Sequence, residues 1–359
     1  MKIALDAMGG DHAPTEVIAG ALGAVLAGFV EAENLVLVGD QPRIEAELKQ
    51  QSATHELDIH HAPEVIGMDE HPGLALRRKR NSSIVVGARL LRENQVGALV
   101  SAGNTGAMVA AGTLLVKLLP GVRRPGIAAT FATAGGPVTL IDVGANIHCL
   151  PEDLYAYGQM ASAYRSGVDG IEAPRIGLLS IGEEDAKGGP LIKQTRALFN
   201  ASSLNFIGNV EGQDLFSGRC DVVVCEGFVG NVVLKVSEGL GSFMSRLLSE
   251  EVRKHAHEAE GGVWKQVGKA LFAKTDYAEY GGAPLLGVDG LIIICHGRSD
   301  RRAVANALRV SRQYLDAKVN QKIVSGLARS PLQTRASDGG GGPVPEQGPE
   351  APEGRGGGA

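Results

Sequence analysis

Residues 3–14, with the sequence IALDAMGGDHAP, contain the pattern that decides the fold. The apolar run Ile3 to Leu5 ends in Asp6, and a turn with two glycines and a proline follows it. Glycine lets the backbone turn sharply, and Pro14 suits the first turn of a helix, where a missing N–H costs little. The stretch therefore predicts a buried strand, a tight turn and a helix over residues 15–27.

The same order of apolar run, polar or Gly-rich turn and helical stretch recurs along the chain. The further apolar runs lie at residues 35–38, 98–100, 138–142, 176–180, 222–225 and 291–295. Strands that alternate with helices indicate βαβ units and a mostly parallel sheet. Ligands bind outside the carboxyl ends of the strands in such sheets, so we expect the turns to gather along a single edge.

Composition separates a folded region from a tail. The chain has 359 residues, of which 44% are apolar and only 4% aromatic, which predicts a core of Val, Leu, Ile and Ala. Residues 331–359 are rich in Gly, Pro and Glu with almost no apolar side chains, so we expect a disordered tail after a single catalytic domain of residues 1–330.

The net charge argues against nucleic acid as a partner. The formal charge is -5, and residues 337–359 contribute -3 through four acidic residues and one arginine, which leaves -2 for the rest. General nucleic-acid binding usually shows a basic excess, and this chain has none.

Neither a signal peptide nor a spanning segment is expected, because no apolar run approaches the roughly 18 residues that a bilayer requires. We therefore expect a cytoplasmic protein. A helix is predicted over residues 237–257, with an amphipathic stretch around Trp264 after Gly261-Gly262. This helical excursion, about residues 238–275, could pack in the core, form a subunit interface or touch the inner face of a membrane.

Two glycine turns follow strands and precede helices in similar form. They contain Gly103, Asn104, Thr105 and Gly106, and Gly227, Gly230 and Asn231. Close backbone approach at glycine and the partial positive charge of a helix start together favour an anion site, although tight turning alone is an alternative. No Walker motif and no GxGxxG turn after the first strand is present, which argues against nucleotide cofactors.

Polar residues at other strand ends are further candidates for binding phosphate or substrate. They are Asp6, Gly9, Gly10, Asp11, His12, Asp142, Asn146 and His296. For Asp6, Asp11 and His12, and for His296, a hydrogen-bonded scaffold role stays open beside a direct role. No further acid or histidine follows at metal-ligand spacing, so we expect no metal.

Catalytic candidates are few. Lys187 lies in a Gly-rich loop after a strand, where its cation could meet phosphate or a developing oxyanion, although a lone lysine is often a solvated charge. No GxSxG elbow is present, and none of the four cysteines has an obvious histidine partner. We expect buried, reduced thiols and direct attack by a bound substrate, without a covalent acyl-enzyme.

Several segments together resemble one known family. They are residues 5–14, 101–107, 142–146, 187–188, 206–211, 227–231 and 280–283. In order and content they are similar to the PlsX-type phosphate acyltransferases of bacterial phospholipid synthesis, over residues 1 to about 325. One departure is Gly188-Gly189-Pro190, where a polar residue is expected after the first glycine.

The resemblance implies a reaction of acyl-[acyl carrier protein] with inorganic phosphate to give acyl-phosphate and free carrier protein, without a cofactor. It implies a three-layer α/β/α fold akin to phosphotransacetylases and isocitrate/isopropylmalate dehydrogenases, in a homodimer. It points to Lys187 and Asn231 as catalytic residues and to membrane contact by residues 238–275.

Carrier proteins are acidic, so a nearly neutral enzyme needs a local basic patch for docking. The candidates are Arg77, Arg78, Lys79 and Arg80, and Arg123 with Arg124. Two rival functions remain: a phosphate acyltransferase for short-chain acyl-coenzyme A, and a scaffold that binds carrier protein or membrane without turnover.

Overall fold

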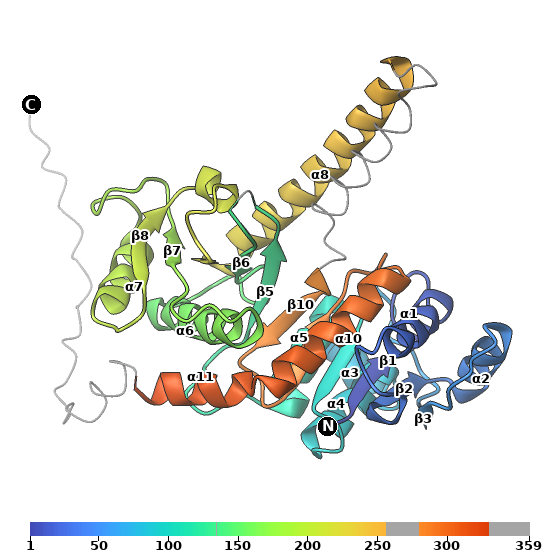
Figure 1. Ribbon diagram of the computed structural model, residues 1–359. Coiled ribbons are helices and arrows are strands. Elements are labelled where there is room, and N and C mark those ends of the chain that lie inside the picture. The colour runs from blue at the N-terminus through green and yellow to red at the C-terminus, as the bar shows by residue number, and fades with distance from the viewer. Residues whose placement is uncertain (134, 256–279, 330–359) are drawn as a thin grey trace, which may run out of the picture.

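The computed structural model of the chain describes residues 1–133, 135–255 and 280–329 (Figure 1). One continuous sheet of eleven strands runs in the order β3-β2-β1-β4-β11-β10-β5-β6-β9-β7-β8. The strands are β1 (Ile3–Asp6), β2 (Leu35–Gly39), β3 (Asp58–His61), β4 (Ala98–Ser101), β5 (Gly126–Phe131), β6 (Val138–Ile141), β7 (Ile176–Leu179), β8 (Phe206–Val210), β9 (Val222–Val224), β10 (Ala283–Leu286) and β11 (Leu291–Ile294).

Two sets of parallel strands make up the two halves of the sheet. We call β3, β2, β1, β4 and β11 the first lobe, and β6, β9, β7 and β8 the second lobe; all pairs within each lobe are parallel. The strands β10 and β5 join the lobes and are antiparallel to each of their neighbours. Three reversals separate β11 from β6, so the two lobes point in opposite directions.

Helices cover both faces of the sheet and make the three layers. They are α1 (Thr15–Leu26), α2 (Gln41–Gln50), α3 (Pro72–Arg78), α4 (Ser83–Arg92), α5 (Thr105–Ala111), α6 (Pro151–Val168), α7 (Pro190–Asn200), α8 (Gly227–His255), α10 (Arg301–Asp316) and α11 (Val319–Ala328), with short helices η1 (Ala32–Asn34), η2 (Gly112–Val116) and η3 (Gly212–Phe216). Successive strand residues belong to alternate cores, because side chains in a strand point to opposite faces. Ile3 and Leu5 belong to the core that also holds residues of α1, α6 and α10, whereas Ala4 belongs to the core on the other face, with residues of α4 and α5.

The helix α8 extends away from the body of the molecule (Figure 1). Its 29 residues give a length of about 43 Å at 1.5 Å per residue. The sequence predicts a helix only from Ser237; the helix begins ten residues earlier because the Gly227 turn itself takes helical form. The amphipathic stretch around Trp264 and the tail of residues 331–359 lie outside the described residues. No helix within the described ranges is long and apolar enough to span a bilayer.

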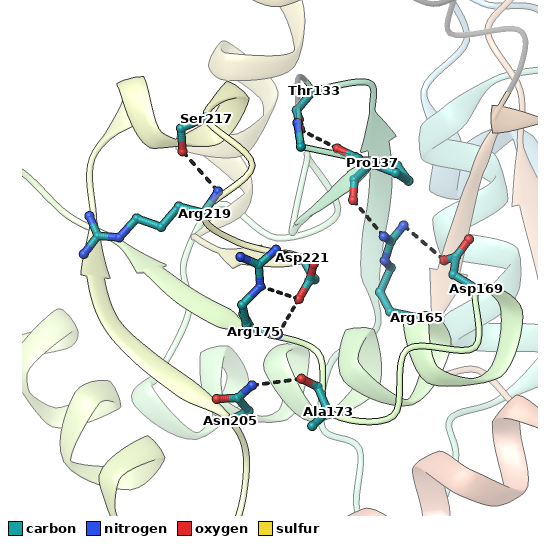
Figure 2. A network of polar contacts seen from close by, with 12 residues as sticks. Thr133, Pro137, Arg165, Asp169, Ala173, Arg175, Asn205, Ser217, Arg219 and Asp221 are labelled. Atoms are coloured by element: carbon teal, nitrogen blue, oxygen red, sulfur yellow. Dashed lines mark hydrogen bonds and ion pairs between the residues drawn. The ribbon is translucent and has the colours of Figure 1, made fainter.

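Ion pairs hold the amino-terminal ends of the second-lobe strands (Figure 2). The buried guanidinium of Arg165 donates to the carbonyl of Pro137 at 2.7 Å and pairs with Asp169 at 3.0 Å. Arg175 binds Asp221 through its backbone N–H at 2.7 Å and through Nε and Nη2 at 3.0 and 2.9 Å. Pro137, Arg175 and Asp221 directly precede β6, β7 and β9, so these contacts fix the amino-terminal edge of the second lobe. The candidate turns of this lobe follow the carboxyl ends of the same strands.

Candidate functional site

The turns after β1 and β4 pack against each other. Asp6 is buried, and its carboxylate accepts hydrogen bonds from Ser101 Oγ at 2.7 Å and from the N–H of Met8 at 3.0 Å. A Cβ on Gly9 would lie only 2.7 Å from the backbone nitrogen of Gly103, so the close approach requires glycine. Burial raises the pKa of Asp6, and these hydrogen bonds oppose the rise. Asp6 therefore acts as an internal anchor for two turns.

Asn104 also serves the scaffold. Its Oδ1 accepts from the N–H of Ala107 at 2.9 Å and caps α5. Its Nδ2 contacts the carbonyl oxygens of Gly67, Met68 and Glu70 at 3.0–3.1 Å. With both polar atoms engaged and the residue 5% exposed, Asn104 holds the loop before α3 in place. The following Thr105 is exposed and Gly106 is half-buried.

Three exposed candidates lie where β1 and β11 end. Asp11, His12 and His296 are exposed, and the N–H of Asp11 donates to the carbonyl of Gly297 at 2.7 Å. The Nδ1 of His296 accepts from the N–H of Arg298 at 3.1 Å. Gly10, with φ of 102°, turns the chain between the two strand ends. The structure thus gathers the first-lobe candidates into one group, which we call the first group.

A second group lies at the carboxyl edge of the second lobe. Asp142 is fully buried and follows β6. Its Oδ1 accepts from the N–H groups of Ile127, Gly144 and Ala145 at 2.9–3.1 Å, and its Oδ2 accepts from that of Asn146 at 2.7 Å. Burial raises the pKa of Asp142, while the four N–H donors act in the opposite direction. The carboxylate shapes the loop of residues 142–146.

Asn146 ties this loop to its surroundings. Its Nδ2 donates to the carbonyl of Pro125 at 2.6 Å and to Tyr157 Oη at 2.8 Å, and its Oδ1 accepts from Arg124 at 3.4 Å. Tyr157 is buried and its pKa is raised by that burial. Tyr157 is a neighbour of this loop that the sequence does not reveal, because it lies inside α6 without a motif around it.

The start of α8 lies directly on the 142–146 loop. The N–H of Gly227 donates to the carbonyl of Asn146 at 2.9 Å. A Cβ on Gly230 would lie 1.9 Å from the carbonyl oxygen of Asp142, so no larger residue fits there. Asn231 is exposed, and a Cβ on Gly144 would lie 3.6 Å from its Oδ1. The turn thereby places the side-chain amide of Asn231 next to Gly144 in the 142–146 loop.

Lys187 is exposed in the loop that follows β7, and its side-chain stem lies over Gly182. Ion pairs hold the loop, because Glu183 pairs with Arg219 and Asp185 pairs with Arg196. Strand β9 lies between β6 and β7 and is parallel to both. Helix α8, which carries Asn231, and the loop that carries Lys187 therefore follow neighbouring strands at the same edge.

One expectation is wrong: the candidate turns do not share a single edge of the sheet. The first-lobe and second-lobe strands run in opposite directions, so their carboxyl ends lie on opposite edges. The first group, with Asp6, Gly103 and His296, therefore follows strand ends at one edge of the sheet, and the second group, with Asp142, Lys187 and Asn231, follows strand ends at the other edge. The sequence hides this division because a strand's apolar run does not show in which direction the strand pairs, and β5 and β10 are antiparallel to both of their neighbours.

The basic docking candidates also divide between the groups. Arg77, Arg78 and Arg80 are exposed at the end of α3, whereas Lys79 is engaged by Glu70 at 2.5 Å and by the carbonyl of Val65. Arg123 and Arg124 are about half exposed, and each places Nε 4.0 Å from a carboxylate oxygen of buried Asp153. Through Arg124 and Asn146, this second pair adjoins the second group.

Neither the cysteines nor the surface hollow at the start of β1 offers a better candidate for a phosphate site than the second group. Cys220, Cys225 and Cys295 are buried, Cys149 is half-buried, and all four are free. Burial raises the pKa of Cys149 to about 11, so it is protonated at neutral pH. A shallow hollow lined by Lys2, Glu31, Glu33, Glu56 and Asp58 lies at the amino-terminal end of β1, and its carboxylates would repel phosphate.

Comparison with known proteins adds the context. A family model described as "Fatty acid synthesis protein" matches residues 1–322. A phosphate acyltransferase from Pelotomaculum thermopropionicum is 46% identical over 328 residues, which cover 91% of this chain and 95% of that protein. One from Heliobacterium modesticaldum is 48% identical over 316 residues, or 87% of this chain and 93% of that protein.

Solved structures match the fold. A phosphotransacetylase from Streptococcus pyogenes aligns with a TM-score of 0.60 at 14% identity, covering 88% of this chain and 94% of the other. The EutD phosphotransacetylase from Staphylococcus aureus aligns with a TM-score of 0.57 at 14% identity, covering 87% and 93%. The α/β/α fold with its likeness to phosphotransacetylases is confirmed, and at this identity the likeness extends to the fold alone.

Proposed function

The chain belongs to the fatty acid synthesis protein family, and from this membership we propose that it is a phosphate acyltransferase acting on acyl-[acyl carrier protein] and inorganic phosphate. The expected resemblance to the PlsX-type phosphate acyltransferases is confirmed by relatives of that name across nearly the whole chain. The proposed product, an acyl-phosphate, would feed phospholipid synthesis.

The proposed reaction needs only its two substrates and donor groups that side chains and backbone amides can provide. An oxygen of hydrogen phosphate attacks the thioester carbon and forms a C–O bond. The tetrahedral intermediate collapses, the C–S bond breaks, and the carrier thiolate leaves and takes up the proton that the phosphate loses. Holding both reactants in a near-attack pose supplies about 7–11 kcal/mol of the barrier. Donors to the developing oxyanion contribute about 3–4 kcal/mol each.

We assign this work to the second group. The single observation that supports the assignment is that Asn231 and Lys187, both exposed, follow the neighbouring parallel strands β9 and β7. Asn231 is the fifth residue of the long helix α8, about one turn from its amino-terminal end, where the partial positive charge of the helix favours phosphate. Lys187 adds a full positive charge on the adjoining loop. Together they bind phosphate and stabilise the oxyanion.

The first group takes a supporting part in this proposal. The polar atoms of Asp6 and Asn104 are engaged in holding turns together, so these residues position backbone and do not contact substrate. Gly9, Gly10, Gly103 and Gly106 serve the same close packing. Asp11, His12, Thr105 and His296 are exposed at the first edge and remain proposed substrate contacts.

The decisive test is an assay of the purified protein with palmitoyl-carrier protein and labelled phosphate, followed by identification of the product. We expect phosphate-dependent release of free carrier protein together with acyl-phosphate. Faster turnover of acetyl-coenzyme A would support the short-chain rival. Binding of carrier protein without phosphate-dependent turnover would support the scaffold rival.

Assembly and location are part of the same proposal. We propose a cytoplasmic homodimer that touches the inner face of the membrane through α8. The support is a run of exposed apolar side chains at helical spacing, with Val236, Leu240, Phe243, Met244 and Leu247 all 40–63% exposed. Such a stripe is suited to a subunit interface or a lipid surface.

A further inference from the structure

Large apolar side chains are exposed on the three loops of the second group. Ile147 is 60% exposed, Ile181 is 84% exposed and Phe228 is 61% exposed. Each lies close in sequence to a residue already discussed: Ile147 follows Asn146, Ile181 begins the loop of Lys187, and Phe228 precedes Asn231 in the same turn. We call these three side chains the apolar rim.

Backbone contacts and strand register bring the rim residues together. Ile147 and Phe228 directly follow the two residues joined by the hydrogen bond from Gly227 N–H to the Asn146 carbonyl. Leu178 of β7 pairs with Val224 of β9, so Ile181 leaves the sheet beside Gly227, each three residues beyond the pair. The rim residues therefore lie on the same neighbouring segments as Asn231 and Lys187 and on the loop of residues 142–146 that contacts the start of α8.

From these positions we propose that the apolar rim binds the acyl chain of the substrate next to its thioester and determines a preference for long chains. The inference rests on the function proposed above. The chain would pass from Phe228 to Val232, one helical turn further on and 44% exposed, at the start of the apolar stripe of α8. An acyl chain is the part of the substrate that gains from leaving water.

The position of the rim distinguishes an acyl chain from other apolar occupants. A second copy of the protein or a permanent lipid contact on the rim would cover the loops that present Asn231 and Lys187. The occupant must therefore arrive and leave with each turnover, as the acyl chain does. The outer part of α8, from Val236 onward, remains available for a subunit or a membrane.

The test compares palmitoyl- and butyryl-carrier protein as substrates of the full chain and of a variant with Ile147→Ala, Ile181→Ala and Phe228→Ala. We expect the ratio of kcat/KM for palmitoyl to that for butyryl to fall roughly tenfold, because the variant removes contacts that only the longer chain makes. Leu26→Ala, at a residue 74% exposed on α1, is the matched control and should leave the ratio unchanged.

An unchanged ratio in the triple variant would overturn the inference, whether both activities fall equally or neither falls. The same holds if the variant changes only the dimer–monomer equilibrium or binding to anionic vesicles. If the triple variant does not fold, Ile181→Ala alone, at the most exposed position, should lower the ratio by about threefold. Absence of acyl-phosphate formation by the native protein from either substrate would reject the proposed function itself, so the two failures are distinguishable.

Discussion

At the residue scale, the buried carboxylates of Asp6 and Asp142 show most clearly that a polar residue at the end of a strand can have a structural role. The sequence places Asp6 and Asp142 at turns and leaves open whether they hold the scaffold or the substrate. Each is nearly inaccessible and is surrounded by backbone or hydroxyl donors, so each shapes its loop. Sequence shows where a polar residue lies along a strand, but its partners come from distant segments such as Ile127.

Gly230 gives a prediction at the same scale. Gly230→Ala would place a methyl group 1.9 Å from the Asp142 carbonyl, so the start of α8 must shift. We expect a loss of about 1–3 kcal/mol in stability, as for other overpacked sites, together with a loss of acyl-phosphate formation. Thermal unfolding and the phosphate-dependent assay measure the two effects.

Gly239→Ala is the matched control, since it lies in the same helix with no atom within 4 Å of the added Cβ. It should keep or raise the melting temperature, because alanine favours a helix over glycine by about 1 kcal/mol. Equal stability and activity of the two variants would contradict the proposed contact between α8 and the 142–146 loop.

At the scale of elements, sequence periodicity predicts the strands that have strong apolar runs. The runs at residues 3–6, 35–38 and 222–225 correspond to β1, β2 and β9. The polar edge strand β3 (Asp58–His61) carries no such run, and the short runs of β5 and β10 do not show that these strands pair antiparallel. Because β5 and β10 reverse the direction of the sheet, missing them leads to the wrong expectation of one edge.

The placement of the arginine pairs gives a prediction for carrier docking. Arg123 lies next to Arg124, which contacts Asn146 of the second group, whereas Arg77 lies at the end of α3 in the first lobe. Arg123→Gln should raise KM for acyl-carrier protein by roughly threefold to fivefold at low salt, with a smaller effect at high salt, since exposed charges are screened. Arg77→Gln serves as the comparison and should change KM little.

Steady-state kinetics at two ionic strengths decides this point. A larger, salt-sensitive effect at Arg77 would move the docking surface to α3. The same small change at both positions and both ionic strengths would reject both patches.

At the scale of the whole molecule, two oppositely directed lobes share one sheet, and only one lobe presents both catalytic candidates. The first lobe has packed glycine turns, and the second lobe presents Asn231 near the start of α8 and Lys187 on the loop after β7, a neighbour of β9. The resemblance names these two residues, but only the strand order reveals that β9 and β7 are neighbours, because the chain between them contains β8.

The most direct test of this arrangement is the rate of acyl-phosphate formation by Lys187→Ala and Asn231→Ala proteins with native melting temperatures. Lys193→Ala and Asn200→Ala, at exposed positions on α7, are the matched controls. We predict that kcat falls by about 100-fold or more in each site variant, as expected for loss of an oxyanion or phosphate contact, while the controls keep the native rate. Native rates in both site variants would contradict the central claim that the second group is the catalytic centre.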